Sequence, residues 1–127
     1  MAGQERFYIC TICGNLVGTI NFSGVPMVCC GTPMEKLIAN TVDASAEKHV
    51  PVFNVNNNIV EVKVGSEPHP MIKEHYIEWI YLETKHGGQR KALSPEDNPE
   101  ATFSLINDEL IAVYAYCNLH GLWRSAV

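Results

Sequence analysis

The sequence has few basic residues and no long apolar run. Of its 127 residues, nine are Lys or Arg and fourteen are Asp or Glu, which gives a net charge of −5. Binding to nucleic acid needs a clustered basic face, so these scattered cations exclude it as an expected partner. No apolar stretch approaches the roughly 20 residues that cross a bilayer, so we expect no association with a membrane. Residues 1–6 lack the basic and apolar segments of a secretion signal.

Helical signals are also scarce. No capping box leads into a long apolar run with a 3.6-residue period. Residues 52–55 and 59–64 are instead β-branched and partly alternating, and the turn-forming asparagines 56–58 join them. Further β-type runs occupy residues 76–84, 102–106 and 110–116. Short runs separated by Pro, Gly and Asn predict an all-β chain with an antiparallel sandwich or barrel.

Residues 7–36 have a different texture, with four cysteines and few large apolar side chains. A segment below about 40 residues rarely builds a sufficient core without a metal, a disulfide or a partner. The chain has five cysteines, an odd number, and several of them are closely spaced. This pattern favours metal ligation in a reducing cytoplasm over a disulfide framework.

The four N-terminal cysteines form two pairs, each followed by glycine. Cys10 and Cys13 have the spacing of a metal knuckle, and Cys29 is directly followed by Cys30. Together they predict a tetrahedral four-thiolate site for Zn or a single Fe, either a structural staple or an electron-transfer centre. Neighbouring side chains of an extended strand point apart, so the second pair requires a distorted backbone.

The fifth cysteine, Cys117, precedes His120 by three residues. His49, His69 and His75 also lie at boundaries of expected elements, where loops on a rigid sheet commonly build sites. Four imidazoles and one thiolate suit Fe, Cu or Zn, and five ligands leave an octahedral ion one open position. That is the geometry of a redox site for a small ligand. The alternative is a set of unconnected histidines and a buried free thiol.

These motifs closely resemble the desulfoferrodoxin family, the two-iron form of superoxide reductase. The similarity runs nearly end to end, through CTICGN, CCG, NTVDA, EKHVPV, VKVG, HPM, EHYIEWI and YCNLHGLW. It implies a small desulforedoxin-like, metal-bound N-terminal domain at residues 1–37. An immunoglobulin-like antiparallel β-sandwich at residues 38–127 would be the catalytic domain.

The resemblance also implies ligands and roles. One iron would be held by four thiolates, from Cys10, Cys13, Cys29 and Cys30. The catalytic iron would have equatorial His49, His69, His75 and His120, with Cys117 axial. Lys48 would attract the substrate anion, and Glu47 would occupy the sixth position once the iron is ferric. Without the resemblance, Glu47 and Lys48 would be interpreted as an ordinary solvated charge pair.

The implied activity is one-electron reduction of superoxide to hydrogen peroxide without release of dioxygen. The implied partners are a rubredoxin-like electron donor and a second copy of the chain in a cytoplasmic homodimer. Three alternatives remain open from the sequence: a non-catalytic iron protein for electron transfer or storage, a zinc-bound structural module, and a superoxide dismutase.

Overall fold

The computed structural model describes residues 7–127, which form twelve strands and one short helix. The chain divides into two compact units, one ending at Ile38 and the other beginning at Ala39. Every pairing between the strands is antiparallel. The predicted all-β class is therefore confirmed. Within residues 7–127, no helix has the length and apolar character needed to cross a bilayer.

The N-terminal unit consists of very short strands. They are β1 (Phe7–Ile9), β2 (Leu16–Gly18), β3 (Val28–Cys29), β4 (Thr32–Pro33) and β5 (Glu35–Lys36). The order β2–β1–β5 makes one small sheet, and β3 pairs with β4 as a hairpin. Apolar packing within the unit includes the rings of Tyr8 and Phe22, whose centroids are 5.0 Å apart. Strands this short bury little apolar surface, as the sequence composition predicts.

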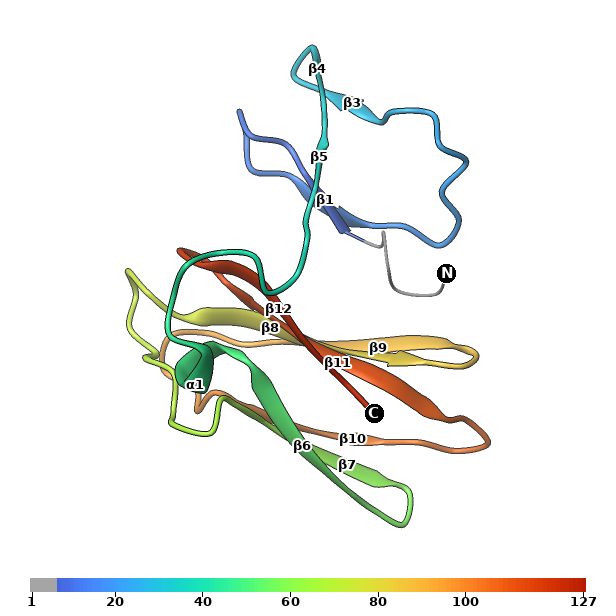
Figure 1. Cartoon of the computed structure of the whole chain (residues 1–127), viewed down its shortest axis with the longest axis vertical. Coiled ribbons are helices and arrows are strands. Elements are labelled where there is room, and N and C mark those ends of the chain that lie inside the picture. The colour runs from blue at the N-terminus through green and yellow to red at the C-terminus, as the bar shows by residue number, and fades with distance from the viewer. Residues whose placement is uncertain (1–6) are drawn as a thin grey trace. The chain divides into compact units, whose positions relative to one another are not determined.

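The second unit is a sandwich of two sheets (Figure 1). The three-stranded sheet, in the order β10–β7–β6, contains β6 (Pro51–Asn56), β7 (Ile59–Val64) and β10 (Glu100–Ser104). The four-stranded sheet, in the order β12–β11–β8–β9, contains β8 (Ile77–Thr84), β9 (Gly87–Ala92), β11 (Leu110–Cys117) and β12 (Gly121–Ala126). The strands expected from β-branched runs all form. The strands β9 and β12 were not expected.

The sandwich core follows from alternation on the strands that face it. On β7, Val60, Val62 and Val64 are buried while their neighbours are exposed. From the facing sheet, Ile80 and Leu82 are fully buried in the same cluster. These Val, Ile and Leu side chains pack closely and make the sandwich rigid. Its loops can therefore hold the side chains of a functional site in fixed positions.

One end of the sandwich carries the segments on which the histidines lie. The one-turn helix α1 (Ala46–His49) lies beside the connection between β7 and β8 (Figure 1). Gly65, in that connection, permits the close approach: a Cβ there would lie 2.5 Å from the backbone oxygen of Glu47. The amide of Glu67 donates to the same oxygen at 2.9 Å. This contact fixes α1 against the connection that carries His69.

Candidate metal centres

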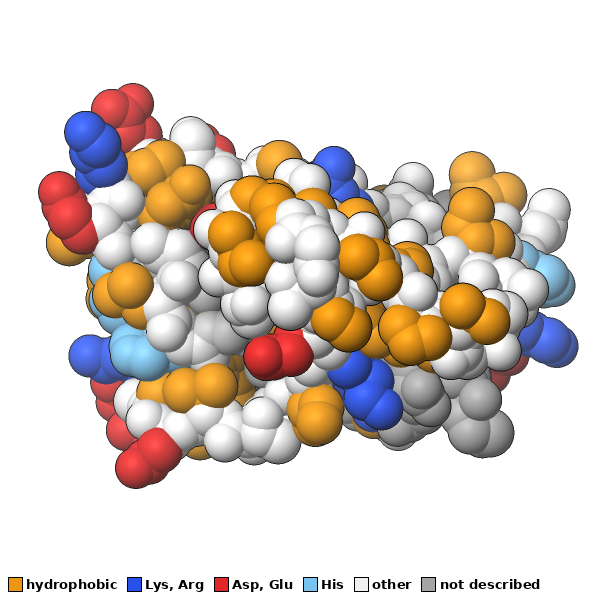
Figure 2. Space-filling view, turned by 90° about the horizontal axis from the view of Figure 1, so that it is seen from above, with side chains coloured by type: hydrophobic (Ala, Val, Ile, Leu, Met, Phe, Trp, Pro, Cys, Tyr) orange, Lys and Arg blue, Asp and Glu red, His pale blue; other side chains and the backbone are white. Residues whose placement is uncertain are grey.

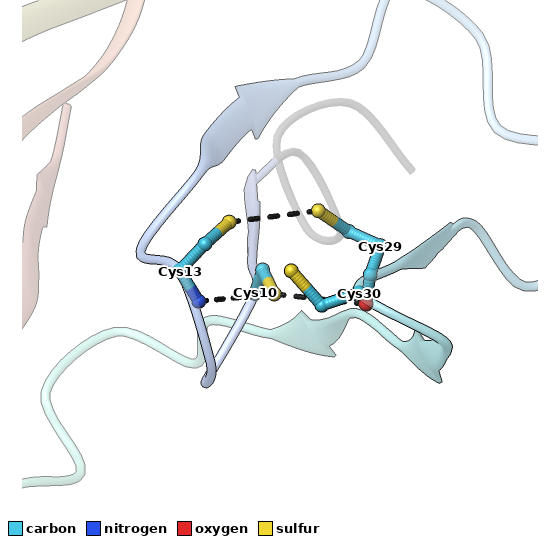
Figure 3. A group of neighbouring side chains, drawn as sticks. All are labelled: Cys10, Cys13, Cys29 and Cys30. Atoms are coloured by element: carbon cyan, nitrogen blue, oxygen red, sulfur yellow. Dashed lines mark hydrogen bonds between the residues drawn. The ribbon is translucent and has the colours of Figure 1, made fainter.

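The four N-terminal cysteines converge, as their spacing predicts. Figure 3 shows their sulfur atoms turned toward one another from two loops, and all four lie within 4.8 Å of each other. The Sγ atoms of Cys13 and Cys29 are 3.6 Å apart. Tetrahedral thiolates with a metal–sulfur distance of about 2.3 Å would be separated by about 3.8 Å. The cluster therefore has the dimensions of a four-thiolate metal site.

Local backbone conformation allows both pairs to reach one point. Gly14 has a φ of 85° after the first pair, and the Gly14 amide donates to the carbonyl of Cys10 at 2.9 Å. Cys30 itself is left-handed, with a φ of 54°, a conformation uncommon for a residue with a Cβ. This is the distortion that adjacent cysteine ligands require.

Hydrogen bonds and crowding act on these thiols in opposite directions. Bonds from the backbone N–H groups of Cys13 and Ile12 lower the pKa of Cys10 to about 6. The neighbouring thiols, that of Cys13 foremost, raise the pKa of Cys30 to about 12. Because several thiolates this close repel one another, only a cation allows them all to ionise. The donor set thus fits a bound metal ion.

Four imidazole rings form a second cluster at the end of the sandwich. Neighbouring rings have centroids 4.6 to 5.0 Å apart and meet at angles of 78° to 86°, in the cyclic order His49, His69, His75, His120. The rings of His49 and His75 lie across the cluster, 6.3 Å apart. Four residues that are distant in sequence are therefore arranged as a square around one point.

The hydrogen bonds of two rings identify the nitrogens that face this point. Nδ1 of His49 lies 2.7 Å from the carbonyl of Ser45, and Nδ1 of His69 lies 2.7 Å from that of Pro70. In each ring Nδ1–H donates to the carbonyl, so Nε2 carries a lone pair. These two Nε2 atoms are only 3.2 Å apart. Two facing lone pairs repel each other, and a cation between them removes the repulsion.

The other donors support the same interpretation. Nε2 of His75 is buried and has no hydrogen-bond partner among the described residues. Nδ1 of His120 lies 3.0 Å from Nε2 of His49 and 3.9 Å from Sγ of Cys117. Nitrogens bound at right angles to one metal at about 2.1 Å would be about 3.0 Å apart. A buried nitrogen without a hydrogen-bond partner is expected of a residue that binds a metal ion.

Burial tunes the protonation of this cluster toward metal binding. Desolvation lowers the pKa of His69 to about 4, and it also lowers the pKa of His49 and of His75. The neutral imidazole is the form that binds a metal. Desolvation raises the pKa of Cys117, so this thiol needs a nearby cation to ionise.

The two charged residues beside His49 are exposed. Desolvation is the main cause that lowers the pKa of His49 and of His75, and the neighbouring rings add to it. The positive charge of Lys48 also lowers both pKa values, as expected of an ammonium group close to these rings. Glu47 has an exposed side chain, while its backbone oxygen is held by Glu67 and by the Ser66 hydroxyl at 3.2 Å. The structure thus places one cation and one carboxylate on the segment next to the cluster.

Sequence reasoning did not assign a role to Trp123, which supports two of the rings. Its indole stacks on His49 with a centroid distance of 4.9 Å, and its Nε1 donates to the carbonyl of His120 at 3.0 Å. The position of this tryptophan after the Cys117–His120 motif is visible in the sequence, but its contact with His49 arises only from the fold.

The fold and the two donor sets define a β-sandwich metalloprotein with two different metal centres. The family model for desulfoferrodoxin matches residues 41–126, and that for the desulfoferrodoxin N-terminal domain matches residues 2–37. A desulfoferrodoxin of Syntrophotalea carbinolica is 50% identical over 125 residues and covers 98% of each chain. A superoxide reductase of Pyrococcus horikoshii is 39% identical over 103 residues, with 67% of this chain and 90% of the relative covered.

Among solved structures, the superoxide reductase of Treponema pallidum superposes with a TM-score of 0.80 at 40% identity, covering 94% of this chain and 97% of that one. The chain belongs to the desulfoferrodoxin family. Its four-cysteine cluster and its histidine–cysteine cluster are consistent with the two iron centres of a desulfoferrodoxin.

Proposed function

We propose that this protein is a superoxide reductase. The reaction joins one superoxide anion, one electron and two protons to give one molecule of hydrogen peroxide, and it releases no dioxygen. The observation that carries the proposal is the convergence of four imidazoles and one thiolate on a single point at the edge of a rigid sandwich. Its relatives include proteins named superoxide reductase.

The catalytic iron would be held by side chains from three segments: α1, the β7–β8 connection, and the end of β11 with the turn that follows it. The donors would be Nε2 of His49, His69 and His75, Nδ1 of His120, and Sγ of Cys117. Bound iron supplies one electron to the substrate as it passes from the ferrous to the ferric state. Four neutral imidazoles leave a positive charge at the site, and the single thiolate offsets part of it.

The exposed residues Glu47 and Lys48 would serve the substrate. The ammonium group of Lys48 attracts superoxide toward the imidazoles against the acidic background of the protein. Water reaches the half-buried rings of His75 and His120 and delivers the protons. The carboxylate of Glu47, on the same short helix, closes the site after turnover. Support for both roles is their position beside His49.

Residues 1–37 would form the domain of the four-cysteine iron, held by Cys10, Cys13, Cys29 and Cys30, and residues 38–127 the catalytic domain. The unit boundary between Ile38 and Ala39 and the two matched family models support this division. The four-cysteine iron would either relay electrons to the catalytic site or serve as a staple for folding.

We extend the proposal to partners and location. A rubredoxin-like protein would return the electron, and the chain would act as a cytoplasmic homodimer. None of the five cysteines forms a disulfide bond, which suits a reducing compartment. The N-terminal unit exposes several large apolar side chains, which suit a protein–protein contact: Ile12, Ile20, Val25 and Val28. Sedimentation equilibrium would measure whether two copies of the chain associate. On the face drawn in Figure 2, Lys and Arg side chains lie apart, with acidic side chains among them.

The stoichiometry of the reaction tests the activity. Reduced, iron-loaded protein is mixed with superoxide under anaerobic conditions, while peroxide, dioxygen and oxidation of the protein are measured together. A superoxide reductase gives one peroxide per superoxide consumed, with one iron oxidised and no dioxygen. A dismutase would give one peroxide and one dioxygen per two superoxide anions, with no net oxidation. A non-catalytic iron protein would leave the rate of superoxide decay unchanged.

A further inference from the structure

A single asparagine joins the two segments that carry four of the five candidate ligands of the histidine–cysteine cluster. The amide of Tyr76 donates to Oδ1 of Asn118 at 2.9 Å, and Nδ2 of Asn118 donates to the carbonyl of Glu74 at 3.0 Å. The backbone N–H of Asn118 donates to the carbonyl of Tyr76 at 3.2 Å. Asn118 is therefore bonded to the residues on both sides of His75.

The position of Asn118 in the sequence gives these bonds their importance. It directly follows Cys117 and precedes His120 by two residues, in the turn between β11 and β12. The three hydrogen bonds thus tie the connection that carries His69 and His75 to the turn that joins Cys117 and His120. Such a connection sets the distance between ligands that lie about 40 residues apart in the chain.

His75 depends on such a connection more than His49 and His69 do. The rings of His49 and His69 are each fixed by a hydrogen bond from Nδ1 to a backbone carbonyl. His75 stands before β8, in a tight turn whose backbone bonds join it to Ile72 at 3.0 and 3.1 Å. The turn is anchored to the neighbouring β11–β12 loop through Asn118.

We propose that Asn118 is a positioning residue for the catalytic metal site: its side chain sets the place of His75 relative to Cys117 and His120. That this metal site is catalytic rests on the proposed function. The role of Asn118 in positioning the ligands does not depend on that activity. Loss of the side chain lets His75 move away from the thiolate. Groups that orient ligands from outside the metal shell typically change metal affinity 10–100-fold when they are removed.

The test uses the full-length, iron-loaded protein and two variants. Asn118→Ala removes both side-chain hydrogen bonds. Asn118→Asp keeps the acceptor for the Tyr76 amide but has no N–H for the Glu74 carbonyl, so its effect should be intermediate. The readouts are the rate at which the catalytic iron is lost to a chelator, the thiolate-to-iron absorption band, and the reduction potential of that iron.

A matched control separates positioning from general stability. Thr84, at the other end of β8, is buried, and its hydroxyl donates to Oδ2 of Asp108 at 2.7 Å. Thr84→Val also removes a side-chain hydrogen bond from that strand, but it does so far along the strand from His75. This variant should unfold at a lower temperature and keep the wild-type absorption band and iron-loss rate.

We expect Asn118→Ala to lose the catalytic iron about tenfold faster and to shift its absorption band and potential. Wild-type values for all three in Asn118→Ala would overturn the proposal, as would equal changes in Thr84→Val. If Asn118→Ala does not fold, Asn118→Asp carries the same comparison. A wild-type protein that binds iron but does not consume superoxide refutes the proposed function and leaves the iron-loss comparison valid.

Discussion

In the N-terminal unit the longest strands have three residues, whereas β8 and β11 of the sandwich have eight each. The first unit exposes large apolar side chains such as Ile20 and Val28, while the sandwich fully buries Ile80 and Leu82. Each unit nevertheless gathers a set of metal donors. The difference in burial indicates that a metal has a different structural role in each unit. We therefore expect the cysteine unit to need a metal in order to fold, and the sandwich to fold without one.

Loss of the four-cysteine metal should have the largest effect. In the double variant Cys13→Ser with Cys29→Ser, we expect residues 7–37 to unfold, because structural metal binding contributes about 10–16 kcal/mol in small domains. Hydrogen exchange would show lost protection at the amides of Cys10 and Leu37, which are bonded to Asn15 and Phe7. The amide of His69, bonded to Val64 in the sandwich, should stay protected.

The control for this prediction is Cys117→Ala, which should release the catalytic iron without unfolding either unit. If the amides of Cys10 and Leu37 stay protected in the double variant, apolar packing alone stabilises the N-terminal unit. The two units would then not differ in their dependence on a metal. The double variant also tests electron relay. Turnover that survives with a protein donor excludes an obligatory path through the four-cysteine iron.

A cavity in the sandwich core should act on the other unit only. Leu82 is fully buried, so Leu82→Ala should lower the free energy of unfolding of the sandwich by about 2–5 kcal/mol. Denaturant titration would measure the loss, with Ile106→Ala as the control, since this side chain is 74% exposed. Equal losses in the two variants would show that the buried cluster does not determine the stability of this unit.

A smaller effect is expected where α1 contacts the β7–β8 connection. In Gly65→Ala the new Cβ would lie 2.5 Å from the Glu47 carbonyl oxygen, so α1 must shift. Overpacking of this kind costs about 1–3 kcal/mol, and we expect faster loss of the catalytic iron because His49 is on α1.

The neighbouring variant Ser66→Ala provides the comparison for this site. It removes one hydrogen bond to the same Glu47 oxygen, worth about 1 kcal/mol, without adding an atom. Calorimetry and chelator competition on both variants would measure the two effects. If Gly65→Ala retains iron as well as Ser66→Ala does, close packing of α1 does not position His49.

The open metal site should respond to charge. Lys48→Ala should lower the second-order rate with superoxide about tenfold and weaken its dependence on salt, because long-range attraction is lost. Lys63→Ala removes an exposed lysine from β7 and should change neither. Pulse generation of superoxide at several ionic strengths gives both quantities. An unchanged rate and salt slope in Lys48→Ala would contradict steering by this residue.

The smallest effect concerns the end of the sandwich that carries no metal donors. Hydrogen bonds from the Thr84 hydroxyl and from the Glu109 and His86 amides lower the pKa of Asp108 to about 2. The ordinary value for an aspartate is about 3.9, so the folded protein binds fewer protons here than the unfolded chain. The stabilisation is therefore present above about pH 4 and is lost as the pH falls toward 2.

Asp108→Asn should thus unfold at a lower temperature than the wild type at neutral pH. The gap between their unfolding temperatures should narrow as the pH falls from about 5 to about 3. A gap that stays constant over this range would mean that the carboxylate charge does not stabilise this end of the sandwich.

Much of this arrangement could be predicted from the sequence, for identifiable reasons. The spacing of the cysteine pairs predicts a shared metal site. The β-branched residues of β7 alternate with polar ones, which predicts a half-buried strand. The strand β9, Gly87–Ala92, has mostly exposed side chains and no apolar alternation, so it left no signal. The distorted backbone expected at the adjacent cysteines is present at Cys30.

The supports of the histidine cluster were beyond sequence reasoning. Asn118 and Trp123 act on residues about 40 and about 70 positions away, and no local pattern encodes such pairings. Gly65 is similar, because the backbone that excludes a side chain there belongs to α1. The Cys and His residues that can bind a metal are visible in the sequence. The distances between their donor atoms are set only by the fold.

The ligands and the redox change of the catalytic iron can be measured together by X-ray absorption at the iron edge of the Cys13→Ser, Cys29→Ser double variant, before and after addition of superoxide. With the four-cysteine site removed, we expect one iron with four nitrogen donors and one sulfur donor, as His49, His69, His75, His120 and Cys117 would supply. Its edge should move from the ferrous to the ferric position as one equivalent of peroxide appears. An iron without a sulfur neighbour would contradict ligation by Cys117, and an iron whose valence does not change would contradict the proposed reduction of superoxide.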